Sequence, residues 1–109
     1  MKKILILALI FSSHLARAEL LLCKVKLRTE NYSEKKISTA SGESTQFEDV
    51  EGYRLKLNNL GGSKFEIEVF DGNAETRSYA RATLKNSANE LSWSLWSREN
   101  LIESSCKLN

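Results

Sequence analysis

The two cysteines are the residues whose chemistry is easiest to predict in this 109-residue chain. Cys23 and Cys106 stand near opposite ends of the chain that follows a candidate export signal. Export leads to an oxidising compartment, where such a pair forms a disulfide. We therefore predict one structural disulfide, in preference to a reactive or intermolecular pair. In the chain-entropy model, closing a loop of this length stabilises a fold by up to about 4 to 5 kcal/mol.

The chain has few side chains that could carry out acid–base catalysis or bind a metal. The one histidine, His14, falls inside the candidate export signal, and the predicted disulfide uses both thiols. Histidine is the side chain best suited to proton transfer at neutral pH and the commonest ligand of zinc and copper. We therefore expect a protein that is not an enzyme and that holds no metal and no cofactor.

Glu66 and Glu68 are of the residue type that glycosidases use in pairs. They alternate with apolar residues in a predicted strand, and the neighbouring strands carry Arg and Lys at matching positions. Acids opposite bases on a solvent face usually form a ladder of weak ion pairs. We interpret the two glutamates as such a ladder and not as a catalytic pair.

The candidate binding face consists of large apolar and arginine side chains on the outside of the predicted sheet. In the predicted strand pairing, Tyr79 lies opposite Trp96, and Trp96 lies opposite Leu101. Aromatic and Arg side chains are favoured contact residues, so this row would bind a protein, peptide or glycan. The alternative is a cross-strand pair that residues 29–52 shield from solvent. The whole face comprises Tyr79, Trp96, Leu101, Arg77, Arg81 and Arg98.

Residues 1–18 have the three parts of a secretory signal peptide. Two lysines precede an apolar run at residues 4–11, and Ala16-Arg17-Ala18 forms a small-residue cleavage site. The apolar run is too short to span a bilayer as a stable helix. We predict cleavage after Ala18, leaving residues 19–109 as a single soluble domain, periplasmic or extracellular, without stable membrane insertion.

Removing the signal changes the charge of the chain. All 14 acidic residues remain but only 13 of the 16 basic ones, so the formal net charge falls from +2 to −1. The longest basic run left is Lys35-Lys36. A nucleic-acid-binding domain needs a basic patch to neutralise phosphates, so we expect no nucleic-acid partner.

Strict alternation of apolar and polar residues predicts an all-β domain. The clearest strand is 90–97, with Leu91, Trp93 and Leu95 on one face and Trp96 on the other with the serines. We interpret this segment as an interior strand of an antiparallel sheet. The acidic segment 43–51 matches no calcium-loop template and is interpreted as a loop or edge strand.

Three hairpins can be aligned on this pattern. The first turns at Gly61, the second at Ser87-Ala88 and the third at residues 98–100. In each register apolar residues face apolar residues, and in the first the charges also match. The predicted pairs are Tyr53–Val69, Leu55–Ile67, Leu57–Phe65, Arg54–Glu68 and Lys56–Glu66; Leu84–Leu91, Ala82–Trp93 and Ala80–Leu95; and Leu95–Ile102, Trp93–Ser104 and Leu91–Cys106.

A meander whose first and last strands are joined by a disulfide closes as a small β-barrel or a flattened sandwich, here of about 7 to 8 strands. Two functions fit such a domain: a secreted or periplasmic binding module, or a structural and assembly subunit of the envelope. A narrower form of the first is an inhibitor of an extracellular hydrolase such as lysozyme, an analogy at the level of the fold.

The cleavage site gives the first testable prediction. The intact mass of the exported protein should correspond to a chain that begins at Glu19 and carries no lipid. A lipoprotein site needs a small residue before the cysteine, and Leu22 precedes Cys23. A mass that begins at Cys23 with an attached lipid would contradict the prediction.

Overall fold

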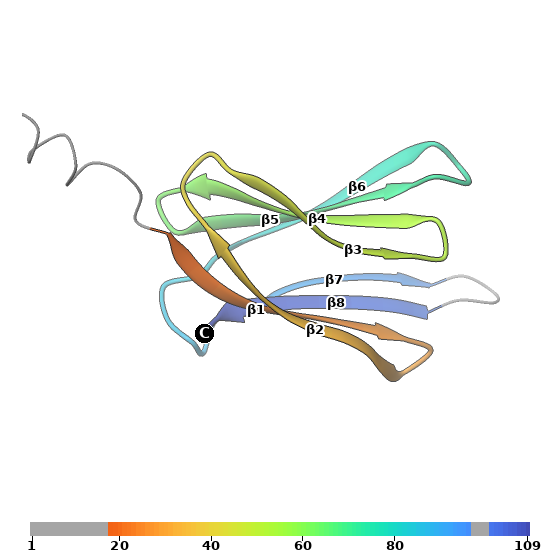
Figure 1. The fold of residues 1–109 in the computed structure, drawn as a ribbon, viewed down its shortest axis with the longest axis horizontal. Coiled ribbons are helices and arrows are strands. Elements are labelled where there is room, and N and C mark those ends of the chain that lie inside the picture. The colour runs from red at the N-terminus through yellow and green to blue at the C-terminus, as the bar shows by residue number, and fades with distance from the viewer. Residues whose placement is uncertain (1–17, 97–100) are drawn as a thin grey trace, which may run out of the picture.

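The computed structural model describes residues 18–96 and 101–109, and these residues form eight antiparallel strands (Figure 1). Residues 1–17 of the predicted signal peptide and Arg98 lie outside the described residues. The strands are β1 (Glu19–Leu27), β2 (Glu30–Thr39), β3 (Ser44–Val50), β4 (Tyr53–Gly61), β5 (Lys64–Asp71), β6 (Thr76–Thr83), β7 (Leu91–Trp96) and β8 (Leu101–Leu108). No helix in this part of the chain has the length and apolar character needed to cross a membrane.

The strands form two four-stranded sheets that pack face to face (Figure 1). Sheet A has the order β2-β1-β8-β7, and sheet B has the order β3-β4-β5-β6. The all-β prediction is confirmed, and the sandwich is the alternative that holds. The barrel does not close, because no ladder joins β2 to β3 or β6 to β7 in the described residues.

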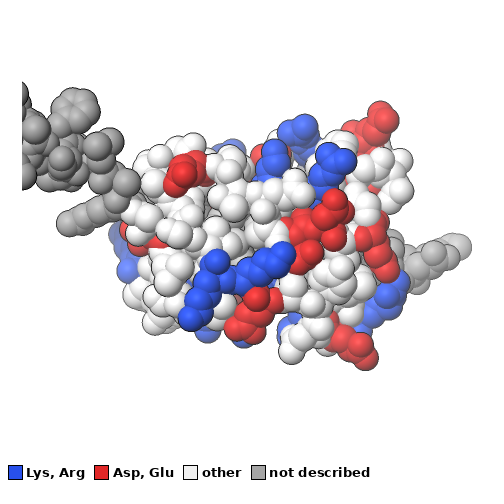
Figure 2. All heavy atoms as spheres, viewed as in Figure 1, with Lys and Arg blue, Asp and Glu red and all other residues white. Residues whose placement is uncertain are grey.

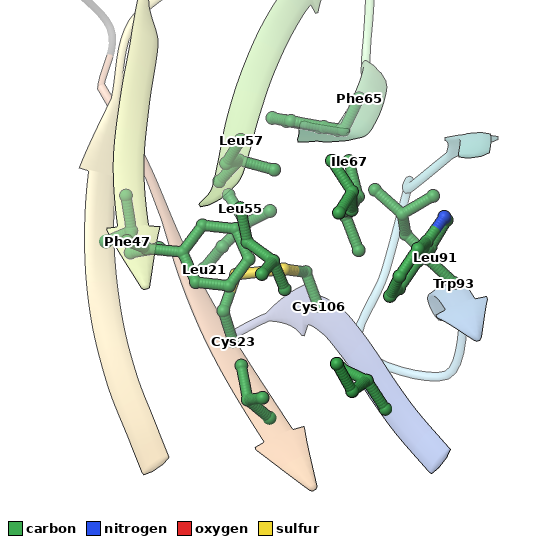
Figure 3. Close-up of a cluster of buried hydrophobic side chains, with 14 of the residues drawn as sticks. Leu21, Cys23, Phe47, Leu55, Leu57, Phe65, Ile67, Leu91, Trp93 and Cys106 are labelled. Atoms are coloured by element: carbon green, nitrogen blue, oxygen red, sulfur yellow. A yellow bond between two sulfur atoms is a disulfide. The ribbon is translucent and has the colours of Figure 1, made fainter. Parts of the chain in front are cut away.

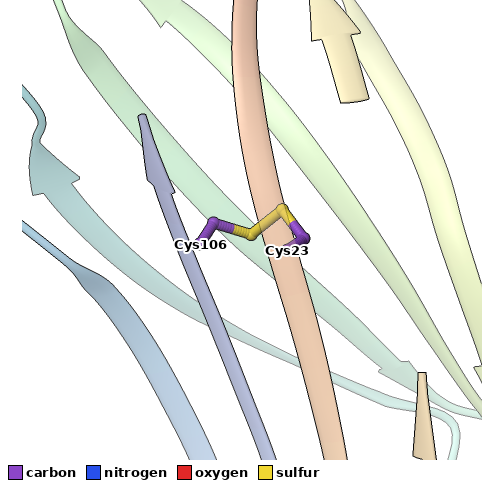
Figure 4. Close-up of a disulfide and its surroundings, with 2 residues drawn as sticks. All are labelled: Cys23 and Cys106. Carbon is purple, nitrogen blue, oxygen red and sulfur yellow. A yellow bond between two sulfur atoms is a disulfide. The ribbon is translucent and has the colours of Figure 1, made fainter. Parts of the chain in front are cut away.

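The pairing of β1 with β8 joins the two ends of the domain. Cys23 and Cys106 are directly opposed in this ladder and form the predicted disulfide (Figure 4). Their Cα atoms are 4.1 Å apart, the short spacing of an antiparallel pair that exchanges no backbone hydrogen bonds. The two residues are 83 positions apart in sequence, so the bridge closes nearly the whole domain.

The core lies between the sheets and is built from alternate residues of both (Figure 3). Phe47 and Val50 of β3 are both buried. The most completely buried large side chains come from five of the strands and from the segment after β6: Phe65, Leu21, Leu55, Leu57, Ile67, Leu84, Leu91 and Ile102.

The chain crosses from sheet A to sheet B at residues 40–43. Asn59, a buried residue of β4, holds this crossing in place. Its backbone N–H donates to the carbonyl of Glu43 at 2.9 Å, and its carbonyl accepts from the N–H of Gly42 at 2.8 Å. Its side-chain amide donates to the carbonyl of Thr39 at 3.2 Å. One asparagine therefore satisfies polar groups on both sides of the crossing.

The chain returns from sheet B to sheet A between β6 and β7, where a hairpin was predicted. We call this segment the return crossing. The pairs Ala82–Trp93, Ala80–Leu95 and Leu84–Leu91 are wrong, because β6 belongs to sheet B and β7 to sheet A. Leu84 turns into the core, and its N–H donates to the carbonyl of Ser63 at 2.8 Å. Alternating residues followed by a turn signal give the same sequence pattern in both cases. The pattern therefore does not show whether the next strand joins the same sheet or the facing one.

The β4–β5 hairpin has the predicted faces but a register two residues away. Leu55 pairs with Val69 and Leu57 with Ile67, whereas the predicted partners were Ile67 and Phe65. A bulge at Leu60 moves the turn to Gly62-Ser63, both with positive φ, as a two-residue hairpin turn requires. The other predicted pairs of this hairpin, Tyr53–Val69, Arg54–Glu68 and Lys56–Glu66, are wrong for the same reason.

The β7–β8 hairpin has the predicted register throughout. Leu91 pairs with Cys106, Trp93 with Ser104 and Leu95 with Ile102. The position of β7 in the sheet was predicted wrongly, since it is an edge strand of sheet A and not an interior one. Trp93 packs inward and its indole N–H donates to the Ser78 hydroxyl of β6 at 3.0 Å, which links the two sheets.

The disulfide should contribute much of the stability of this domain. Replacing Cys23 and Cys106 together with alanine should lower the free energy of unfolding by roughly 4 kcal/mol, measured by urea denaturation, because the unfolded chain gains entropy. Wild-type protein in strong reductant is the matched comparison, since it keeps both side chains. Equal urea midpoints for oxidised and reduced protein would contradict this account.

Candidate functional site

The five residues of the predicted binding face that the structure describes do not form one face. Tyr79 pairs with Glu68 and lies with Arg77 and Arg81 on the outer face of sheet B. Trp96 pairs with Leu101 on the outer face of sheet A. The predicted contact between Trp96 and Leu101 is present, but that between Trp96 and Tyr79 is wrong. The cause is the return crossing, which places the two aromatic residues on opposite outer surfaces of the sandwich.

The outer face of sheet B carries a hydrogen-bonded charge network. Arg77 binds Glu68 at 3.1 Å and Arg81 binds Glu66 at 2.5 Å. The side-chain amide of Asn58 donates to both glutamates, at 2.8 Å to Glu66 and 3.1 Å to Glu68. This arrangement is the ion-pair ladder that the sequence predicted for the two glutamates, with an asparagine added at its centre.

Glu66 is buried although it lies on the outer face, with a side chain that is 6% exposed. Burial would raise the pKa of this carboxyl, but hydrogen bonds from Arg81 and Asn58 and the Arg81 charge outweigh it. The pKa of Glu66 therefore lies below its ordinary value of 4.5. A carboxylate that Arg81 and Asn58 hold ionised contributes to the structure and is a poor general acid.

An aromatic site beside this network was not predicted from the sequence. The guanidinium groups of Arg54 and Arg77 lie over the ring of Phe70, at 5.8 and 5.4 Å from its centroid. Two cations on one ring neutralise its negative face, and Arg77 is also bound to Glu68. These groups already satisfy one another, so this outer face offers few free contacts to a ligand.

The outer face of sheet A has fewer ion pairs, although the Ser92 hydroxyl donates to a carboxylate oxygen of Glu90 at 3.1 Å. Lys24 on β1, Ser105 on β8 and Ser92 on β7 form one cross-strand row. Lys26, Glu103 and Ser94 form the next row. Neither lysine nor Glu103 makes an ion pair within the described ranges. Short serines beside long lysines leave a groove of about 300 Å³ over these rows.

Trp96 stands at one end of this face, in the row that follows Ser94 and Glu103. Its side chain is 77% exposed, the highest value among the large apolar residues that the structure describes as exposed. Its strand partner Leu101 is half-buried beside it. The outer face of sheet A therefore combines hydroxyl groups, charges of both signs and one uncovered indole.

The edge formed by β2 and β3 carries charges of both signs. Figure 2 shows Lys, Arg, Asp and Glu interspersed on the side of the molecule that it presents. Lys35 lies 3.3 Å from Glu48 and donates to the carbonyl of Phe47 at 2.8 Å. Burial would raise the pKa of Glu48, but hydrogen bonds from Ser33, the Asp49 backbone and Lys35 lower it. The acidic segment is thus an edge strand, partly neutralised by its neighbour.

Fold and surface together define a small antiparallel β-sandwich, bridged by one disulfide and polar on its outer faces. Comparisons with protein-family models, with curated proteins and with solved structures found no match. In the described residues, no group of three or more His, Cys, Asp or Glu side chains could hold a metal ion.

The buried carboxylate of Glu66 should make the stability of the fold depend on pH in the acid range. Glu66→Gln should lower the urea midpoint at neutral pH, because it leaves Arg81 without its anionic partner. A lowered native pKa means that the unfolded chain binds more protons, so this stabilisation is lost as pH falls below 4.5 and through the native value. The difference between wild type and variant should therefore shrink in acid. Exposed Glu34 provides the control: Glu34→Gln should change little, and a Glu66→Gln difference independent of pH would contradict the prediction.

Proposed function

We propose that this chain is an exported, non-enzymatic binding module whose ligand-binding surface is the outer face of sheet A around Trp96. The observation that carries the proposal is the exposure of Trp96 on the same outer face as a groove lined by lysine, glutamate and serine side chains. The predicted signal peptide at residues 1–18 and the disulfide, which persists in oxidising compartments, support export.

The two tryptophans of β7 show why Trp96 is assigned to binding. Trp93 is 8% exposed, packs in the core and uses its indole N–H on Ser78. Trp96 is three residues further along the same strand and contributes little to the core. Exposed aromatic rings supply a large contact area at a low entropic cost when a partner covers them.

The groove favours a polar ligand that has one apolar face. A glycan has this chemistry, because its hydroxyl groups match Ser92, Ser94 and Glu103 while a sugar ring can stack on the indole. A protein or peptide partner would use the same surface, as an inhibitor of an extracellular hydrolase such as lysozyme would. In each case Trp96 contributes the large apolar contact at one end of the face.

Tyr79 provides a matched control for a test of this proposal. It is an aromatic residue with 53% exposure on the opposite outer face. Trp96→Ser should abolish retention of ligands from a native envelope extract by immobilised protein, whereas Tyr79→Ser should leave it unchanged. Both variants should melt within a few degrees of wild type, because neither residue is in the core. Equal retention by all three proteins, or a large loss of stability in Trp96→Ser, would contradict the assignment.

A further inference from the structure

The four edge strands of the sandwich differ in how they prevent pairing with other strands. β2 carries Lys35 and Lys36, β3 carries a bulge and Glu48, and β6 carries two arginines. β7 reads Leu-Ser-Trp-Ser-Leu-Trp, with no charge, no proline and no bulge. Natural sheets protect their edges with these features, so β7 is the edge that is open to another strand.

The backbone of β7 presents its unpaired groups at alternate residues. The N–H of Arg28 donates to the carbonyl of Leu101, and the N–H of Asn109 donates to that of Leu20, so odd-numbered residues of β8 bond to β1. Even-numbered residues of β8, such as Cys106, therefore bond to β7 through Leu91, Trp93 and Leu95. The N–H and C=O groups of Ser92, Ser94 and Trp96 therefore point to the free edge.

β6 leaves much of this edge uncovered. The bond from Trp93 to Ser78 connects the two strands on the inner side. Beyond it the strands diverge, and β7 and β6 are well separated at the ends that carry Trp96 and Thr76 (Figure 1). No strand of the described chain pairs with β7 on this side.

We propose that the occupant of this edge is β7 of a second copy of the chain. β7 is self-complementary about Ser94 when two copies run antiparallel around a two-fold axis. Ser94 then faces Ser94 of the second copy, and Ser92 faces Trp96, with small residues opposite large ones on the outer face. On the inner face, Trp93 of one copy lies opposite Leu95 of the other. This register uses the backbone groups that point outward. The two copies of sheet A then join into one eight-stranded sheet.

A second copy fits this edge better than an unrelated strand does. The uncharged edge gives no charge pattern by which to select a foreign peptide. Its own sequence pairs with itself without like charges in register and places Trp93 of one copy beside half-buried Leu95 of the other. The proposal concerns the strand edge and is independent of the ligand bound on the outer face.

Ser94→Pro tests the proposal, with Ser94→Ala as its control. The Ser94 N–H makes no bond to β8, so proline removes a donor from the edge and leaves the monomer ladder intact. Sedimentation velocity should show wild type passing from monomer to dimer with rising concentration. Ser94→Pro should raise the dissociation constant at least about tenfold, because each dimer loses two hydrogen bonds. Ser94→Ala keeps both donors and should stay within about threefold.

A wild type that stays monomeric at all concentrations would overturn the proposal, as would a Ser94→Pro protein that dimerises like wild type. If Ser94→Pro fails to fold, amide exchange of the wild type decides. The Ser92 and Ser94 amides should exchange more slowly as concentration rises, and unchanged rates would overturn the proposal. A monomer in which these amides become protected only on addition of envelope extract would assign the edge to a foreign strand and overturn the second-copy assignment.

Discussion

The pairing of β1 with β8 is the interaction on which the rest of the sandwich depends. Sheet A contains only strands from the two ends of the domain, and β1–β8 is its one ladder between distant segments. Without this ladder, sheet A would be two separate hairpins that each cover half of sheet B. Its long sequence separation makes closure entropically costly, and the disulfide stands in this ladder. The covalent bond therefore strengthens the fold where chain entropy opposes it most.

Much of the fold follows from alternation, because a period of two fixes which face of a strand is buried. The faces of β1, β4, β5, β7 and β8 were predicted correctly, as was the disulfide. Alternation cannot fix register where a residue is inserted, and the bulge at Leu60 moved the β4–β5 pairing by two positions. It also cannot show where a chain changes sheets, and the crossing after Leu84 was therefore read as a hairpin.

The candidate binding face shows how one wrongly predicted strand connection affects the prediction of a site. Trp96 and Leu101 are neighbours within a hairpin and were predicted correctly, whereas the Tyr79 contact depended on β6 joining β7. The network around Asn58 depended on the shifted register, which places Asn58 opposite Glu66. A site confined to one hairpin can be predicted from sequence; one that spans two sheets requires the order of the strands.

The proposed ligand face and the strand edge of β7 meet at Trp96 without excluding each other. Side chains project perpendicular to a sheet, while backbone hydrogen bonds lie within its plane. A second copy at the edge would set only the small Ser92 beside Trp96, so the indole face would stay open to a ligand. The two-fold axis would also bring two grooves onto one continuous surface. Association would then place two sites side by side, and a ligand with repeating units would bind both more tightly than either alone.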